Sequence, residues 1–268
     1  MKIILNKKRL KNIISKDVNL GFVPTMGGIH KGHLSLCKRS IRECDKTIVT
    51  IFVNKKQFNK NEDYKKYPRM IKKDISLLKK LKIDYLYIPT ENQIFESKEK
   101  KIRINPFGKI LCGKFRPGHF EGVLDVINRF IKIIKPKSIY LGEKDMQQYI
   151  LIKDFIGKEF NEVKVVLCKT IRKKNGLAMS TRNTFLSLED EKKASKVYNF
   201  LKKNKKKIVN NKNFNNSLEK KLITFGVSDL EYIKVIDINK IFKPYIKKNN
   251  YKIFIAYYFN EIRLIDNI

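Results

Sequence analysis

Residues 20–36 read LGFVPTMGGIHKGHLSL, and this stretch decides the fold. The run LGFVPT (20–25) has the continuous apolar character of a buried parallel strand. Gly27 and Gly28 follow it and allow a tight turn with the backbone open to a ligand. Apolar residues then recur at helical spacing, at Leu34, Cys37 and Ile41. The start of such a helix presents unpaired N–H groups, so the stretch predicts a strand, a glycine turn and a helix that attract an anion such as phosphate.

The same alternation of strand and helix continues through the first two-thirds of the chain. Further apolar runs that end in turn signals are TIVTIFV (47–53), IDYLYIP (83–89), SIYLG (138–142) and VKVVLC (163–168). Helical patterns lie at about 31–43, 68–81, 119–134 and 145–157. This predicts a Rossmann-like, doubly wound α/β domain over residues 1–172, with a ligand site at the carboxyl ends of its strands.

The last third of the chain has a different pattern. Lysine-rich helical stretches at about 188–207 and 215–225 precede the apolar runs EYIKVID, YKIFIAYYF and IRLID. The last two runs are separated by Asn260-Glu261, which could turn a hairpin. We therefore expect a smaller α+β domain over residues 173–268.

The composition points to a soluble protein with an unusual charge. The formal net charge of +34 permits an RNA-binding module as one hypothesis, but the lysines are scattered through every segment instead of forming one patch. The four cysteines form no C-x-x-C pair, which favours free thiols of a reducing cytosol. No stretch approaches the roughly 18 apolar residues of a membrane span, and the start of the chain is no signal peptide, so the expected location is the cytoplasm.

His30 and His33 are two of only three histidines in the chain. Three residues apart, they would share one face of the first helical turn, where two N–H donors could reach the same anion. Gly32 between them would let a flat ring approach the backbone. A metal-binding pair and two incidental surface histidines are the alternatives, although no third metal ligand is evident in this segment.

One motif is a chance match. Residues 108–114, GKILCGK, have the spacing of a phosphate-binding P-loop, but Phe115 stands where Ser or Thr must bind magnesium. Asn105-Pro106 precedes the motif instead of a strand, so we expect no P-loop here.

Seven blocks of sequence carry a resemblance that spans nearly the whole chain. They are PTMGGIHKGH, IFVNKKQF (51–58), YPR (67–69), RPGHFEGV (116–123), GEKDMQQ (142–148), GLAMSTRN (176–183) and RLIDN (263–267). In order and spacing they resemble the pantothenate synthetase family, the pantoate–β-alanine ligases, within the nucleotidyltransferase superfamily that carries an H-x-G-H signature. The resemblance implies that ATP activates pantoate as a pantoyl-adenylate, which the amine of β-alanine then attacks. AMP and pyrophosphate are released.

The resemblance also implies which residues bind ATP. By similarity, His33, His30, Lys144 and Arg182 would act on the phosphates. The complete nucleotide-binding set would be Met26, Gly27, Gly28, Ile29, His30, Lys31, Gly32, His33, Gly142, Glu143, Lys144, Asp145, Ile171, Met179, Ser180, Thr181 and Arg182. Ile171 would line the adenine pocket, and Ser180 and Arg182 would close over the phosphates as part of a C-terminal lid domain.

Pantoate and magnesium have their own expected ligands. Gln57 and Gln148 resemble the paired pantoate ligands of the family, with Asn54 shaping the same pocket. Val126 and Ile127 could enclose the methyl groups of pantoate. The family often has paired acidic residues after Y-P-R, near Mg²⁺, whereas here Lys73 precedes Asp74. Asp74 is thus the expected helper in binding Mg²⁺, which triphosphate oxygens and water could hold mostly unaided.

The resemblance further implies a homodimer with small-molecule substrates and no specific nucleic acid or membrane partner. The main alternative function is another nucleotidyltransferase of the superfamily, an adenylyl- or cytidylyltransferase that makes a dinucleotide-like product.

Overall fold

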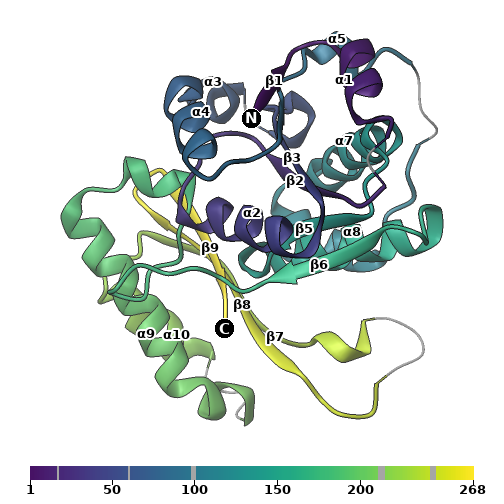
Figure 1. The fold of residues 1–268 in the computed structure, drawn as a ribbon. Helices are drawn as coiled ribbons and strands as arrows, with labels where there is room; N and C mark the ends of the chain where they lie inside the picture. Colours follow the sequence, from purple (N-terminus) through teal and green to yellow (C-terminus); the bar gives the residue numbers. More distant parts are fainter. Residues whose placement is uncertain (17, 60, 98–100, 211–214, 242–245) are drawn as a thin grey trace. The chain divides into compact units, whose positions relative to one another are not determined.

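The computed structural model covers residues 1–268 and describes all of them except 17, 60, 98–100, 211–214 and 242–245. The chain forms two compact units, Met1–Lys169 and Thr170–Ile268, which are described separately (Figure 1). The limits 1–172 and 173–268 and the lid role of the second unit stay predictions.

A six-stranded parallel sheet forms the centre of the first unit (Figure 1). Its strands are β1 (Lys2–Ile4), β2 (Leu20–Thr25), β3 (Lys46–Ile51), β4 (Tyr85–Tyr87), β5 (Ser138–Gly142) and β6 (Lys164–Cys168). They lie in the order β1-β4-β3-β2-β5-β6, and every neighbouring pair is parallel. The chain extends the sheet from β2 to β3 and β4 on one side, and later adds β5 and β6 on the other. The strand order therefore reverses between β2 and β5, and doubly wound sheets bind ligands at the carboxyl ends of the strands beside such a reversal.

Helices and short 3-10 helices connect the strands of the first unit. The helices are α1 (Lys7–Ile14), α2 (Lys31–Glu43), α3 (Asn61–Lys66), α4 (Ile71–Lys80), α5 (Glu91–Ile94), α6 (Cys112–Phe115), α7 (His119–Ile134) and α8 (Met146–Glu159), and the 3-10 helices are η1 (Lys55–Gln57), η2 (Pro106–Lys109) and η3 (Glu143–Asp145). Helix α2 packs against β2, β3, β5 and β6, whereas α7 packs against α1 and α8. The predicted doubly wound domain is confirmed.

Both faces of the sheet are buried, which explains why the strands read as continuous apolar runs. On one face, Val23 of β2 belongs to a cluster with Leu36 and Cys37 of α2. On the other face, the ring of Phe22 lies 5.7 Å from that of Phe130 of α7. Neighbouring residues of β2 thus reach opposite layers, as strand geometry requires.

Three details of the first unit bear on the sequence analysis. The short edge strand β1 is missing from the prediction, because its three residues precede a lysine-rich stretch. Residues 108–114 lie in η2 and α6 and have no strand before them, so they form no P-loop. All four cysteines are free thiols, as predicted, and burial raises the pKa of Cys37 to about 12.

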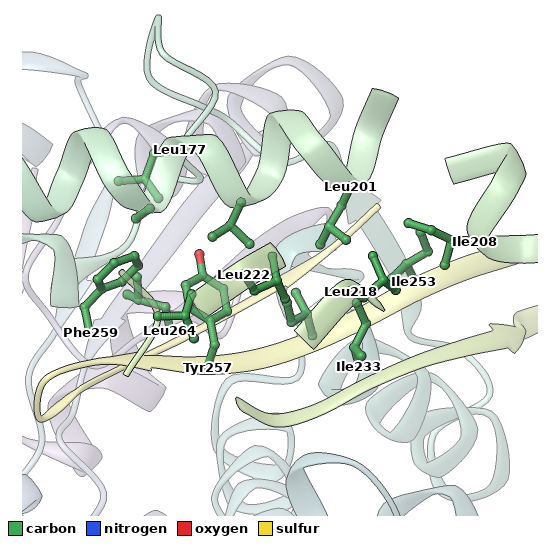
Figure 2. Close-up of a cluster of buried hydrophobic side chains, with 14 residues drawn as sticks. Leu177, Leu201, Ile208, Leu218, Leu222, Ile233, Ile253, Tyr257, Phe259 and Leu264 are labelled. Carbon is green, nitrogen blue, oxygen red and sulfur yellow. The ribbon is translucent and has the colours of Figure 1, made fainter. Parts of the chain in front are cut away.

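In the described part of the second unit, a three-stranded antiparallel sheet packs with two α-helices. Its elements are η4 (Thr181–Phe185), α9 (Leu188–Asn210), α10 (Asn215–Ile223), β7 (Asp229–Asp237), η6 (Ile238–Lys240), β8 (Tyr251–Phe259) and β9 (Ile262–Asn267). Figure 2 shows its core, in which side chains from α9 and α10 meet those of the sheet: Leu201, Ile208, Leu218, Leu222, Ile253 and Tyr257. Asn260 turns the β8–β9 hairpin with a φ of 52°, so the predicted α+β arrangement is confirmed. Across the described parts of both units, no helix is long and apolar enough to cross a membrane.

Candidate active site

The glycine turn after β2 has the backbone conformation that its sequence predicts. Gly27 and Gly28 have φ angles of 84° and 63°, in the left-handed region that favours glycine. The amide of Gly27 donates to Thr25 Oγ1 at 3.1 Å. The amides of Gly28 and Ile29 donate to the carboxylate of Asp74, at 2.9 and 2.7 Å. Contrary to the prediction of a backbone open to a ligand, these amides are hydrogen-bonded within the protein.

His30 and His33 begin helix α2, and their rings lie side by side with centroids 4.1 Å apart. Nδ1 of His30 accepts the amide of Gly32 at 3.1 Å, and Nδ1 of His33 accepts the amide of His30 at 3.4 Å. The Gly32 amide, expected to be unpaired, is capped by the histidine that precedes the helix. Because Nδ1 accepts in both rings, the proton of each neutral imidazole is on Nε2. The two Nε2–H groups make no hydrogen bond within the described part of the chain and can donate to an anion.

The electrostatic environment keeps both imidazoles neutral at pH 7. Burial and then the positive charge of Lys144 lower the pKa of His30 from 6.5 to about 4, although Asp145 opposes the shift. Burial, His30 and Lys144 lower the pKa of His33 well below its usual value. Lys144 itself follows β5, so the turns after β2 and β5 place one ammonium group close to two neutral donors. That combination suits a polyanionic ligand.

The turn after β5 also leaves room beside its backbone. A Cβ added to Gly142 would meet no atom of the described protein within 4 Å. Glu143, Lys144 and Asp145 form η3, and Lys144 Nζ lies 3.3 Å from Asp145 Oδ1. The structure thus brings Gly142 to Asp145 to the same edge of the sheet as Met26 to His33, including Lys31 in the first turn of α2.

The 3-10 helix η1, which carries Gln57, packs directly against helix α7. Asn54 caps η1 and is buried, and its Nδ2 donates to the carbonyl of Gly122 at 3.0 Å. A Cβ on Gly122 would lie 2.4 Å from the carbonyl oxygen of Lys56, so only glycine permits this close approach. Asn54 therefore shapes the turn instead of offering its amide group to a ligand.

Two residues of the R-P-G-H block hold the main chain of Gln57. Arg116 Nη2 lies 3.0 Å from the carbonyl oxygen of Gln57, and His119 Nδ1 lies 2.8 Å from the same atom. Arg116 Nη1 is also 3.1 Å from His119 Nε2. Neither residue is predicted from the sequence to have a role. The sequence feature that could have indicated a role is His119 itself, the third histidine of the chain, which follows a glycine within one of the seven blocks.

The adjacent glutamines of α8 have different environments. Gln147 is buried, and its amide accepts the N–H of Cys112 and donates to the carbonyls of Phe107 and Ile110. The side chain of Gln148 is only part-buried and makes no hydrogen bond to the described residues. Its amide group is therefore available to a ligand, as is that of Gln57. Val126 and Ile127 are buried in α7.

The residues expected in the second unit form one local structure. The amide of Met179 donates to the carbonyl of Ile171 at 2.9 Å. Ser180 caps η4, with its Oγ accepting the amide of Arg182 at 3.3 Å, and Thr181 is buried. A short pairing of Arg172 with Ala178 supports this segment from within the unit. Ile171, Met179, Ser180, Thr181 and Arg182 are thus held in one segment of the second unit.

Comparison with known proteins shows the family. The model of the pantoate-beta-alanine ligase family matches residues 2–268. The chain belongs to the pantoate-beta-alanine ligase family. A pantothenate synthetase of Francisella tularensis subsp. mediasiatica is 40% identical over 263 residues, which cover 96% of this chain and 92% of the relative.

Solved structures of pantoate-beta-alanine ligases have the same fold. The enzyme of Francisella tularensis, complexed with beta-gamma ATP and beta-alanine, is 37% identical with a TM-score of 0.84, covering 100% of this chain and 97% of that one. A pantothenate synthetase of Thermus thermophilus is 31% identical with a TM-score of 0.90, covering 100% of this chain and 99% of that one. The family predicted from seven sequence blocks is confirmed, and the chain is a ligase that forms a carbon–nitrogen bond.

Proposed function

We propose that this ligase condenses pantoate with β-alanine to pantothenate in two steps. In the first, a carboxylate oxygen of pantoate bonds to the α-phosphorus of ATP, and the bond from that phosphorus to the bridging oxygen breaks to release pyrophosphate. In the second, the amine nitrogen of β-alanine bonds to the acyl carbon, loses a proton and displaces AMP. The observation that carries the proposal is a family match over residues 2–268 in a chain whose His30, His33 and Lys144 meet at the sheet's switch point.

The first step needs a site that reduces repulsion between two anions. Lys144 supplies positive charge, and the Nε2–H groups of His30 and His33 supply neutral donors for phosphate oxygens. Because both imidazoles are neutral at pH 7, they act chiefly as hydrogen-bond donors to charge that develops on the leaving pyrophosphate. No protein nucleophile is needed, since the substrate carboxylate attacks.

Residues of η1, α7 and α8 select pantoate. The side-chain amides of Gln57 and Gln148 bind the carboxylate and hydroxyl oxygens of pantoate, while Val126 and Ile127 enclose its methyl groups. An amide binds these oxygens without neutralising the nucleophile, which an arginine or lysine would do.

Further residues bind the nucleoside of ATP and cover its phosphates. Gly142, Glu143 and Asp145 bind the nucleoside with Met26 to Gly32, and Ile171 and Met179 enclose the adenine. Ser180, Thr181 and Arg182 close over the phosphates as part of a lid formed by residues 173–268, which excludes water from the adenylate. Mg²⁺ arrives with ATP as part of the substrate.

The cellular location, the oligomeric state and the partners of the enzyme are proposed from the same family membership. The protein is a cytoplasmic homodimer that acts on small molecules. Its net charge of +34 attracts nucleic acid only weakly, so any RNA binding is lost at moderate salt.

A product assay tests the function. The pure protein is incubated with ATP, Mg²⁺, pantoate and β-alanine, and pantothenate, AMP and pyrophosphate are measured by chromatography. We expect all three in equal amounts, and no pyrophosphate when pantoate is omitted. A stable dinucleotide-like product, or no pantothenate at any of several pH values, would overturn the proposal in favour of another nucleotidyltransferase.

A further inference from the structure

Asp74 is a buried acid that faces the glycine turn of the ATP site. It lies in the first turn of α4 and is 1% exposed. Its Oδ2 accepts the amide of Gly28 at 2.9 Å, and its Oδ1 accepts the amide of Ile29 at 2.7 Å. Both carboxylate oxygens therefore bind the main chain immediately before His30.

The glycine turn needs an acceptor of this kind. With Gly27 and Gly28 both at positive φ, the backbone folds back on itself, and its buried N–H groups require partners. A carboxylate that accepts two amides forms charge-assisted hydrogen bonds, which are about twice as strong as neutral ones. A negative charge beneath a triphosphate site opposes anion binding, so its benefit lies in the geometry that it imposes on the turn.

Asp74 does not fit a direct role in holding Mg²⁺. That ion requires near-octahedral oxygen ligands, with several supplied by water and phosphate. Among the residues that the structure describes, no group of three or more His, Cys, Asp or Glu residues could hold a metal ion. Each Asp74 oxygen already accepts a main-chain amide, the residue is almost fully buried, and its neighbour in the sequence is Lys73.

We propose that Asp74 is a positioning residue that fixes the glycine turn and thereby aims His30 and His33 at the phosphates of ATP, without ligating the metal. The carboxylate binds two consecutive amides, and the second of these belongs to Ile29, the residue directly before the capping His30. This inference rests on the proposed function, because it assigns how the ATP site of that reaction is shaped.

The test separates positioning from metal binding in the active wild-type enzyme. Failure of the wild type to form pantothenate would count against the proposed function, whereas the Asp74 variants address only this inference. Asp74→Asn retains one acceptor but places an NH₂ group against a backbone N–H. We expect a KM for ATP raised roughly tenfold or more and a lower kcat, with the Mg²⁺ concentration for half-maximal activity, at saturating ATP, unchanged.

The matched control is Asp84→Asn. Asp84 also accepts a backbone amide, that of Thr47 at 2.9 Å, but it lies directly before β4 and beside the amino end of β3, away from the carboxyl ends of the strands. Its variant should lose stability and keep the wild-type KM for ATP. A several-fold rise in the Mg²⁺ requirement of Asp74→Asn, or wild-type kinetics for it, would overturn the inference.

A measurement on the wild type keeps the inference testable if Asp74→Asn does not fold. Mn²⁺ alone, used as a paramagnetic probe in place of Mg²⁺, is titrated into the ¹⁵N-labelled protein. Unbroadened amide signals of Gly28 and Ile29 support positioning. Selective broadening of those two signals at low Mn²⁺ would show that the metal reaches Asp74 and would overturn the inference.

Discussion

His119 Nδ1 lies 2.8 Å from the main-chain carbonyl oxygen of Gln57, across a sequence separation of 62 residues. With Arg116 Nη2 at 3.0 Å from the same oxygen, the start of α7 fixes the backbone of a residue whose side chain remains available. The third histidine of the chain thus holds the backbone of Gln57, and in the proposed pantoate site it would act through that residue.

His119→Ala is expected to raise the KM for pantoate roughly 5- to 30-fold, because one hydrogen bond to Gln57 is lost. The KM for ATP should change little, since His30 and His33 lie on a different turn. His119→Asn places an amide N–H near the position of Nδ1 and should recover most of the affinity. Initial rates at saturating ATP measure both variants, and equal rises in both KM values would contradict this role.

The two glutamines of α8 provide a matched pair of variants. Gln147→Ala removes one hydrogen bond from each of three main-chain groups, the N–H of Cys112 and the carbonyls of Phe107 and Ile110, and should lower the free energy of unfolding by about 2–4 kcal/mol. Gln148→Ala should leave stability almost unchanged and impair pantoate use. Urea unfolding and pantoate kinetics together test the pair, and the opposite assignment of the two defects would refute it.

The sequence predicts much of the fold because local patterns determine it. The run LGFVPT coincides with β2, and the helical pattern over residues 119–134 coincides with α7. Both are predictable because the spacing of apolar residues within each segment shows which side chains are buried. The partners of Asp74 and Gln147 are not predictable in this way. Asp74 binds amides 45 and 46 residues away in the sequence. Gln147 and Gln148 have identical side chains, and only the fold decides that Gln147 is the one surrounded by main-chain hydrogen-bond partners.

Asp266 of the RLIDN block forms an ion pair with Arg172, next to the segment of the second unit that is proposed to bind the nucleotide. Asp266 is 8% exposed and binds Arg172 through two contacts of 2.6 and 2.8 Å, while the guanidinium lies over the ring of Tyr198. Asp266→Asn should lower the free energy of unfolding by about 3 kcal/mol, because it leaves a part-buried cation poorly paired. It should also raise the KM for ATP, since Arg172 follows Ile171 directly.

An exposed ion pair of the same unit is the control for this prediction. Glu189 is 75% exposed and pairs with Lys193, so Glu189→Gln should change the free energy of unfolding by less than about 1 kcal/mol. Chemical denaturation measures both variants. Equal effects of the two substitutions would show that burial of the Arg172–Asp266 pair has no energetic consequence.

The lowered pKa of His30 makes stability depend on pH in a defined direction. The unfolded chain takes up a proton near pH 6.5, whereas the folded protein resists protonation of this ring until about pH 4. Protons therefore favour the unfolded state between these values, and stability falls as the pH drops from 6.5 to 4. With partial solvent screening, the contribution of His30 is about 2 kcal/mol.

His30→Asn isolates this contribution from the carboxyl groups that titrate over the same range. Asparagine retains a capping oxygen for the Gly32 amide but carries no titratable proton. The difference in unfolding free energy between wild type and His30→Asn, measured by denaturant titration at each pH, should therefore shift in favour of the variant as the pH falls from 6.5 to 4. A difference that stays constant over this range would show that His30 titrates normally in the folded protein and that its ring is not held neutral beside Lys144.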